Sequence, residues 1–467
     1  MKAIALIAAL STTFAVAFWL TPSFARLDDA YIALHSARVV LSGHDPIYQV
    51  PALVGVTSPA YVALLTAIIG AGVRAGSSAL RLANALGFVA YVSALLYLGQ
   101  TVGLTPIRKA ALIAIALASG FTLFHLTNGL ETGWAMAVLT FAIGCAYAER
   151  LVLVSICAGL LPFLRPDLAP AALLVLCAAA WGRPWRQQLS ALGLALVVAA
   201  PWLLWMRVDT GSWLTQTIRA KQLFYAEGCL PWLKKTAVVA ASFAACLGLL
   251  FPLSLGIASL GRSRLGRVGL LSIAICLLSY FVAYPGALGL GFFRYLYPIV
   301  VPWLCFGFAL GLTRVNTGVA ATVAIALLVT RLVIWPDRHT DEYAREVVAS
   351  AEWIDDHVPP DAVLLVHDAG GISEFAHRRA VDLVGLKTPA SIQAHARWTY
   401  PSCGRARRVA VDAIARESGA SYFVGLSGWE EPLRADLEAN GFTLTARRRP
   451  PVGVRAGYTV YQLAVRP

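Results

Sequence analysis

The sequence predicts a polytopic α-helical membrane protein with a soluble α/β domain at its C-terminal end. Hydrophobic residues make up 58% of the 467 residues and charged residues only 13%, and the mean hydropathy is +0.68. Apolar runs of roughly 15 to 20 residues recur between short turns that contain Arg, Gly or Pro, as in chains that cross a bilayer repeatedly. From about residue 336 the composition becomes that of a soluble domain.

The first apolar run, MKAIALIAALSTTFAVAFWL, has a short basic start followed by about twenty residues suited to a membrane span. A cleaved signal peptide is the alternative, but PSFA is a poor small-residue cleavage site. We therefore expect a retained first span with the N-terminus in the cytoplasm. Ten further spans are expected near 79–99, 110–125, 132–148, 150–164, 168–182, 189–206, 236–259, 268–285, 295–313 and 317–335. The membrane domain of about 11 helices then covers residues 1–335.

The apolar segment at 58–73 decides on which side of the membrane every later loop lies. If it is a re-entrant or surface-lying helix, the short-loop cations fall in the cytoplasm, which is the side that such residues prefer. These cations are Arg108, Lys109, Arg150, Arg183, Arg186, Arg262, Arg264, Arg267 and Arg314. If 58–73 spans, all of them are exported. We expect the first arrangement, in a bacterial inner membrane, with outer loops at 21–78 and 207–235 and a periplasmic tail at 336–467.

The tail has the pattern of a small α/β domain. Helices are expected at 340–358, with Thr340 as N-cap, and at 405–418, ended by Gly419. Strands are expected at 362–367, 422–426, 442–449 and 458–465. The DAGG turn after the first strand lacks the GxGxxG pattern of a dinucleotide site. We therefore expect a binding or scaffold domain.

Charge and cysteine usage exclude some classes of function. The net charge is +13, but the basic residues are scattered over many short loops and form no single basic face, so no nucleic-acid partner is expected. Five of the eight cysteines lie inside apolar runs, where Cys behaves as a small hydrophobe. We expect no disulfide framework and see no metal-ligand spacing.

Two adjacent carboxylates, Asp28 and Asp29, follow the first apolar run and open an amphipathic segment. Carboxylates are costly to desolvate, so their place beside the membrane needs an explanation. One interpretation is a pair of helix N-cap residues, stabilised by exposed amides and the macrodipole. The other is a general base beside a second carboxylate that positions substrate or binds a cation. Two like charges also raise each other's pKa, which suits a proton acceptor.

Six motifs follow one another in the segments expected outside the cytoplasm. They are DDAYIALHSARVVLSGHDPIYQ with GVTSPAYVALL, NGLETG, LRPD, DTGSWLTQTIRAK, RYLYP and HDAGGISEFAHRRAVDLVGL. In this order they resemble the polyprenyl-phosphate-dependent glycosyltransferases of the GT-C superfamily, and within it the arabinofuranosyltransferase-like branch. The resemblance implies a sugar donor joined to polyprenyl phosphate, with D-arabinofuranose as the expected sugar. It also implies an inverting transfer in which a first-loop Asp deprotonates the acceptor.

The expected reaction belongs at the membrane surface, because the lipid donor arrives from the bilayer and the acceptor from water. The acceptor is an envelope glycan, glycolipid or protein such as a pilin. The departing phosphate gains negative charge, so cations should surround it. Candidates for donor-phosphate binding are Arg294 and Lys221, with Arg219 and Arg165 behind them; the alternative for each is snorkelling to lipid headgroups.

Candidate sugar or acceptor contacts are Glu131, His35, Tyr31 and Tyr295. His35 stands where the arabinofuranosyltransferase-like branch commonly has an Arg-Tyr pair, and a structural role is its alternative. For Glu131 the alternative is a helix N-cap region, and Asp167 is expected to cap a helix. A divalent metal beside the paired carboxylates, the oligomeric state and the choice between Asp28 and Asp29 as base stay open.

Two other classes of function fit parts of the sequence. A transporter or flippase of a lipid-linked sugar would bury ionisable groups near the bilayer midplane and often shows inverted repeats, whereas here the suggestive residues gather in outer loops. A noncatalytic assembly or receptor protein fits the tail but leaves the acidic pair unexplained. The glycosyltransferase is the leading hypothesis.

Overall fold

The computed structural model describes residues 2–21, 25, 27–73, 76–313, 316–334, 338–454 and 457–466. The chain divides into two compact units. Unit 1 comprises Met1–Thr21, Arg81–Leu204 and Pro231–Pro336; unit 2 comprises Pro22–Leu80, Trp205–Leu230 and Asp337–Pro467. Unit 2 thus combines the tail with the two segments that the sequence analysis expects as the first outer loop and the long loop.

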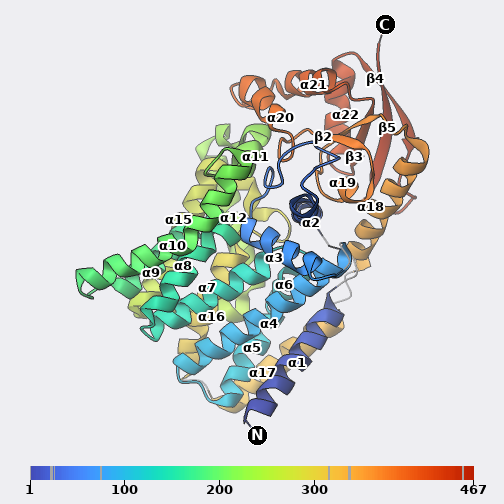
Figure 1. Cartoon of the computed structure of the whole chain (residues 1–467). Helices are drawn as coiled ribbons and strands as arrows, with labels where there is room; N and C mark the ends of the chain where they lie inside the picture. Colours follow the sequence, from blue (N-terminus) through green and yellow to red (C-terminus); the bar gives the residue numbers. More distant parts are fainter. Residues whose placement is uncertain are drawn as a thin grey trace. The chain divides into compact units, whose positions relative to one another are not determined.

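Unit 1 is helical (Figure 1). Its elements, with α4 and α10 reaching into unit 2 at one end, are α1 (Lys2–Leu20), α4 (Ser77–Thr101), α5 (Pro106–Ala118), α6 (Thr122–Thr127), α7 (Thr132–Tyr147), α8 (Leu151–Leu164), η1 (Pro166–Leu168), α9 (Ala169–Ala180), α10 (Trp185–Thr210), α12 (Trp232–Leu249), α13 (Phe251–Ser254), α14 (Ile257–Arg262), α15 (Arg264–Ala283), η3 (Pro285–Gly289), α16 (Tyr297–Leu312) and α17 (Thr317–Ile334). A helix lies in each of the apolar runs identified in the sequence. Among the described residues, α4, α10, α12 and α15 are long and apolar enough to cross a bilayer.

Two helices end earlier than the sequence pattern suggests. The run expected at 110–125 is helical only to Ala118, after which α6 begins at Thr122. The run expected at 236–259 is interrupted after Leu249, and Pro252 then lies in the first turn of α13. Proline has no backbone N–H and fits the first turn of a new helix better than the interior of an old one. Hydrophobicity alone does not reveal such interruptions.

The core of unit 1 lies along α16, which packs against α5, α7, α14 and α15. Trp303 on α16 is fully buried. A Cβ placed on Gly307 would lie 2.4 Å from the carbonyl oxygen of Gly256, so this close approach of two segments depends on glycine. Helices α7, α8 and α9 follow one another through short turns and pack together. Because they are antiparallel neighbours, the start of α7, the end of α8 and the start of α9 lie at one end of unit 1.

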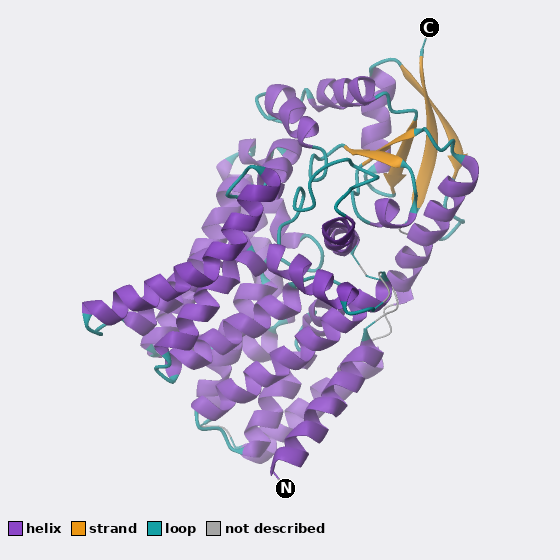
Figure 2. Ribbon diagram, in the orientation of Figure 1, coloured by secondary structure: helices purple, strands orange, loops and turns teal. Residues whose placement is uncertain are grey.

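Unit 2 is an α/β assembly around one five-stranded sheet in its described residues, drawn in orange in Figure 2. The strand order is β2-β1-β3-β5-β4. The strands are β1 (Val363–Val366), β2 (Arg379–Asp382), β3 (Tyr422–Leu426), β4 (Phe442–Arg448) and β5 (Tyr458–Val465). β1 pairs in parallel with β2 and β3, and β5 pairs antiparallel with β3 and β4. The sequence pattern indicated four of these strands and missed β2.

The helices of unit 2 come from three separate parts of the chain. They are α2 (Asp28–Ser42), α3 (Pro59–Gly70), α11 (Thr217–Tyr225) with η2 (Glu227–Cys229), α18 (Arg338–His357), α19 (Gly371–Phe375), α20 (Pro389–Ala394) with the π-helical turn η4 (His395–Thr399), α21 (Arg407–Ser418) and α22 (Glu430–Ala439). α18 begins at Arg338, so Thr340 is inside the helix and the expectation that it is the N-cap was wrong. The 12 residues of α3 extend about 18 Å, which is less than a hydrocarbon core of about 30 Å.

Candidate functional site

The acidic pair occupies the first turn of α2, but neither carboxylate caps that helix. Leu27 takes the N-cap position, with extended backbone and no side-chain hydrogen bond. The N-cap interpretation of the pair was therefore wrong. Both aspartates are half-buried, and their contacts within unit 2 differ. The two carboxylates are therefore described separately by their partners: Asp28 contacts the tail and Asp29 contacts the long loop.

The carboxylate of Asp28 is held by the tail. Its two oxygens accept backbone N–H groups from Gly370, at 2.8 Å, and from Gly371, at 2.5 Å. These amides lie at the start of the short helix α19. A Cβ on Gly370 would approach the Asp28 carbonyl oxygen to 2.0 Å, so only glycine permits this contact. The DAGG motif, which the sequence left without a role, forms the cradle for Asp28.

Burial raises the pKa of Asp28 well above its usual value, and the negative charges of Asp368 and Asp29 raise it further. The amides of Gly371 and Gly370 oppose this shift, because they stabilise the ionised form. Asp368 follows β1 and contacts His367 Nδ1 at 3.0 Å and the hydroxyl of Tyr458 at 3.4 Å. The tail therefore both positions the Asp28 carboxylate and contributes to its raised pKa.

Asp29 forms an ion pair with the long loop. Its Oδ2 lies 3.4 Å from Nζ of Lys221 on α11. Neither group is sealed from solvent, because the side chain of Asp29 is 31% exposed and that of Lys221 is 19% exposed. The structure therefore brings the acidic pair, whose first carboxylate has a raised pKa, together with a cation that the sequence singled out separately.

Tyr31 and His35 lie on α2 and point into the interior of unit 2. Tyr31 is fully buried, accepts the Ala25 N–H at 3.0 Å and packs edge-on against Phe375. His35 is also buried, and its Nε2 lies 3.1 Å from Oδ1 of Asp45. Burial lowers the pKa of His35. Both side chains therefore make structural contacts inside unit 2, and their role as sugar contacts stays a prediction.

A buried lysine that the sequence did not single out connects the first outer loop to the tail. Lys387 is fully buried, and its Nζ donates to Ser36 Oγ at 2.7 Å and to the Ala52 carbonyl at 3.5 Å. Burial lowers its pKa to about 8. Arg38 and Glu374 form a second connection at 2.7 Å, and the Glu374 side chain is buried. These contacts hold α2 against the tail, and with it the position of Asp28.

The long loop is also attached to the tail covalently. Cys229, in η2, and Cys403 form a disulfide across 174 residues of sequence. The expectation of no disulfide framework was therefore wrong. The other six cysteines lie in apolar helices, since Cys305 of α16 joins the five that the sequence pattern indicated. Arg219, two residues before Lys221, lines a cavity of about 830 Å³. Gln216, Gln393 and Arg397 line the same cavity, and Lys221 is not among its lining residues.

A second group of predicted residues gathers in unit 1, at the ends of α7, α8 and α9. Arg165, which is almost fully buried, forms a bidentate pair with Asp167 at 3.1 and 3.0 Å. Its Nη1 also donates to Oε1 of Glu131 at 2.9 Å, and the Tyr280 hydroxyl donates to Asp167 at 3.0 Å. Two carboxylates thus neutralise Arg165, which is neither snorkelling to headgroups nor left with excess positive charge. Asp167 and Glu131 orient Arg165 and do not cap helices with their side chains.

Arg294 lies beside this cluster, over the ring of Tyr295. Its Cζ is 4.9 Å from the ring centroid and its Nη2 donates to the Tyr295 hydroxyl at 3.0 Å. Cζ of Arg165 lies 5.3 Å from the centroid of the same Tyr295 ring. The turn before Arg294 has left-handed backbone at Phe292 and Phe293, with φ of 59° and 65°. Such strain in bulky residues is uncommon and often accompanies functional sites.

The described part of the chain contains no preformed cluster of metal ligands. No group of three or more His, Cys, Asp or Glu side chains there is arranged to hold an ion. Asp28 and Asp29 supply two carboxylates, which a divalent ion bound together with substrate oxygens could use.

Comparisons with known proteins give two kinds of match. Residues 336–461 match a family described as "Domain of unknown function (DUF8728)". The comparison with curated proteins found no match. Solved structures, in contrast, match over almost the whole chain. ArnT from Cupriavidus metallidurans in the apo state has a TM-score of 0.57 at 12% identity, over 99% of this chain and 98% of ArnT.

Two ligand-bound structures show the same similarity. ArnT from Cupriavidus metallidurans bound to undecaprenyl phosphate has a TM-score of 0.54 at 13% identity, over 98% of this chain and 97% of ArnT. The archaeal oligosaccharyltransferase AglB from Archaeoglobus fulgidus, in complex with an inhibitory peptide and a dolichol-phosphate, has a TM-score of 0.50 at 13% identity, over 98% of this chain and 74% of AglB. At these identities the similarity concerns the fold. The chain therefore shares the fold of ArnT and AglB, in agreement with the resemblance inferred from the sequence, and four helices in its described part are long and apolar enough to cross a membrane.

Proposed function

We propose that this chain is an inverting glycosyltransferase that moves a sugar from a polyprenyl-phosphate donor to an acceptor of the cell envelope. The observation that carries the proposal is the arrangement of Asp28, Asp29 and Lys221. It places a carboxylate with a raised pKa beside an ion-paired cation in the first outer loop and the long loop. The fold shared with ArnT and AglB supports a lipid-phosphate donor.

In the proposed reaction the acceptor hydroxyl attacks the anomeric carbon of the donor sugar. The new bond joins the acceptor oxygen to that carbon, and the bond from the carbon to the phosphate oxygen breaks. Asp28 accepts the hydroxyl proton, and the electron pair leaves with the polyprenyl phosphate. Lys221 stabilises the charge gained by that phosphate, while Asp29 holds the lysine in place. Arg294, Arg165 and Arg219 remain predictions for donor-phosphate binding, and Glu131 and Tyr295 for sugar or acceptor contacts.

The site is proposed to face the periplasm of a bacterial inner membrane. The disulfide between Cys229 and Cys403 supports this assignment, because such bonds persist in oxidising compartments and are rare in the cytosol. D-arabinofuranose is the proposed sugar, on the resemblance of the loop motifs. The proposed acceptor is an extracytoplasmic glycan, glycolipid or protein such as a pilin.

The proposal is tested by incubating the purified full-length protein with a panel of synthetic polyprenyl-phosphate sugars and a cell-envelope extract. Mass spectrometry then measures released polyprenyl phosphate and glycosylated acceptor. Release that depends on the acceptor, with an arabinofuranosyl donor preferred, supports the function. If the lipid-linked sugar is moved across proteoliposome membranes without cleavage, the chain is a transporter and the proposal is wrong.

The pH dependence of transfer is expected to report the raised pKa of Asp28. A base works only when deprotonated, so the rate should fall as the pH drops through the Asp28 pKa, at a higher pH than an ordinary aspartate would give. Asp368→Asn removes a charge that raises this pKa, so the acidic limb should move to lower pH. Asp412→Asn, on an exposed ion pair with Arg416, is the control and should leave the limb in place. A limb unaffected by Asp368→Asn would contradict the assignment.

The disulfide gives a prediction about location. When the protein is denatured without reductant in the presence of a thiol-reactive polyethylene glycol, Cys229 and Cys403 should stay unlabelled in protein from intact cells. They should become labelled after reduction, which adds two labels per chain. If both cysteines react before reduction, the disulfide is absent in the cell and the long loop lies in a reducing compartment. The Cys229→Ser variant should expose Cys403 alone.

A further inference from the structure

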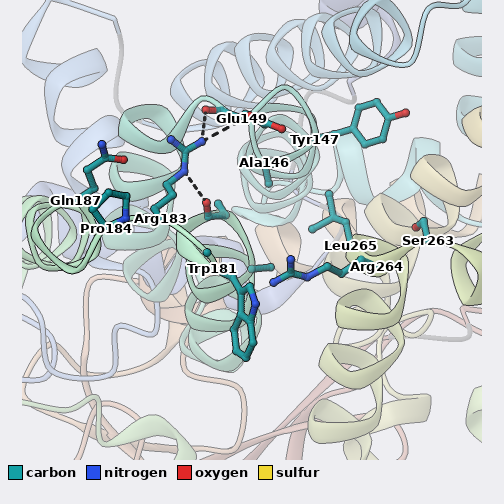
Figure 3. A pocket seen from close by; sticks show the side chains of 13 residues that line it. Ala146, Tyr147, Glu149, Trp181, Arg183, Pro184, Gln187, Ser263, Arg264 and Leu265 are labelled. Atoms are coloured by element: carbon teal, nitrogen blue, oxygen red, sulfur yellow. Dashed lines mark hydrogen bonds and ion pairs between the residues drawn. The ribbon is translucent and has the colours of Figure 1, made fainter.

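Three turns of unit 1 meet at the ends of α7, α9 and α14, around a cavity of about 610 Å³ (Figure 3). They connect α7 to α8, α9 to α10 and α14 to α15. These turns lie at the opposite ends of α7, α8 and α9 from the cluster of Arg165, Glu131 and Asp167, because each helix has one end in each place. The cavity is therefore separate from the predicted sugar and donor residues of unit 1.

The three turns carry a strong excess of positive charge. Between residues 147 and 151, 181 and 188, and 261 and 268 there are six arginines and a single acidic residue, Glu149. The arginines are Arg150, Arg183, Arg186, Arg262, Arg264 and Arg267. The structure gathers residues that are spread over more than 100 positions of sequence at one end of the unit. An anionic ligand is the partner that this charge favours.

Two arginines line the cavity and differ in their contacts: Arg183 is held by hydrogen bonds to backbone carbonyls, whereas Arg264 is exposed. Arg183 bridges two turns, because its Nε donates to the Ala179 carbonyl at 3.1 Å and its Nη2 to the Glu149 carbonyl at 3.0 Å. Glu149 itself has a left-handed backbone, with φ of 58°, and its largely exposed carboxylate lies 4.0 Å from Nη2 of Arg183. Arg264 is exposed, lies over the ring of Trp181 at 5.1 Å, and has no ion-pair partner among the described residues.

Two tryptophans and an apolar helix face lie next to these cations. Trp181 is 72% exposed and Trp185 is 66% exposed, as is typical of tryptophans at the level of lipid headgroups. Beyond Trp185, Leu189 and Leu192 on α10 are exposed as well. A soluble anion would use the arginines and leave these apolar surfaces in water. A diacyl lipid would use both, with its phosphate at the arginines and its chains along α10.

We propose that this cavity binds the headgroup of an anionic phospholipid of the cytoplasmic leaflet. The phosphodiester lies against Arg264 and beside Arg183, which both line the cavity, and Trp181 packs beside the glycerol. The acyl chains follow the exposed apolar face of α10. The site would fix unit 1 at the inner membrane surface, and it does not depend on the proposed transfer reaction.

The test uses the purified full-length protein in neutral detergent and native mass spectrometry. Dioleoylphosphatidylglycerol and dioleoylphosphatidylcholine are added in equal amounts, and the first is expected to be retained preferentially. Arg264→Gln should weaken retention of phosphatidylglycerol about fivefold, and the double variant with Arg183→Gln by about the square of that factor. Arg207→Gln is the matched control, because Arg207 also lies over a tryptophan, Trp213, but at the other end of α10. Its retention should equal that of the unmodified protein.

Several results would overturn the inference. Equal retention of the two lipids, retention unchanged by Arg264→Gln, or an equal loss in Arg207→Gln would each show that the cavity is not the site. Displacement of the lipid by excess inorganic phosphate would identify a site for a soluble anion instead. The leaflet is tested by introducing Gln187→Cys at the cavity in a variant whose exposed Cys177 is replaced. An impermeant maleimide should label this new cysteine only from the cytoplasmic side.

Discussion

Replacing Asp28 with Asn is expected to reduce sugar transfer by about 10²- to 10⁴-fold, the range typical of a lost general base. The Asn side chain keeps one oxygen that can accept a hydrogen bond from a glycine amide. It cannot take the proton from the hydroxyl of the acceptor. The loss should appear in kcat, with KM for the lipid donor little changed, because donor binding is assigned to cations and not to Asp28. Released polyprenyl phosphate, measured at saturating donor, is the quantity to follow.

A matched pair of variants separates this effect from misfolding. Asp29→Asn leaves the proposed base but removes the partner of Lys221 at 3.4 Å, so it should raise KM more than it lowers kcat. Asp412→Asn, on an exposed ion pair of the tail, should behave like the unmodified protein. All three variants must accumulate to similar levels and elute as single species in detergent. Normal turnover by both Asp28→Asn and Asp29→Asn would rule out the acidic pair as the source of the base.

Replacing Lys221 with Gln is expected to lower transfer by about 10²- to 10³-fold, as when one stabiliser of developing negative charge is removed from an active site. The charge grows on the phosphate as the sugar leaves, so both kcat and the affinity for the donor should fall. Lys221→Arg should recover part of the rate, because it restores a cation near Asp29. Transfer assays with varied donor concentration give both constants.

The control for Lys221 is another cation of the same unit. Arg405 is exposed and donates to the Ser402 carbonyl, and it has no assigned role in donor or acceptor binding. Arg405→Gln should keep full activity. If Lys221→Gln and Arg405→Gln lose activity equally, the effect is one of overall charge and Lys221 is not a specific phosphate ligand. If neither loses activity, the donor phosphate is bound elsewhere.

Local patterns in the sequence were sufficient to locate most helices and strands. Runs such as Thr132–Tyr147 and Leu151–Leu164 are apolar throughout and bounded by polar turns, so hydrophobicity alone defines them. The same holds for Tyr422–Leu426 and Tyr458–Val465 in the tail. The short strand Arg379–Asp382 was missed, because it starts with an exposed charge and ends on a buried one. Its place in the sheet is decided by pairing with β1.

The acidic pair could be selected from the sequence, but its surroundings could not. The glycine amides that bind Asp28 are 342 and 343 residues away, and no local periodicity encodes such a contact. Lys387 looks like a surface residue in VGLKTP, yet it is fully buried against the first loop. Cys229 and Cys403 are likewise ordinary loop residues until the fold brings them together. Sequence motifs therefore indicated which residues matter, and tertiary contacts decide what each one does.

The distance along the chain between Asp28 and its two amide donors has a consequence for biosynthesis. A ribosome releases the first outer loop long before it has translated Gly370 and Gly371, so a nascent chain whose helices are already inserted still lacks the groups that orient this carboxylate. The proposed base would therefore lack its amide partners throughout synthesis of the chain. The carboxylate would reach its final environment in one late step, when the C-terminal tail folds onto a loop made at the very beginning.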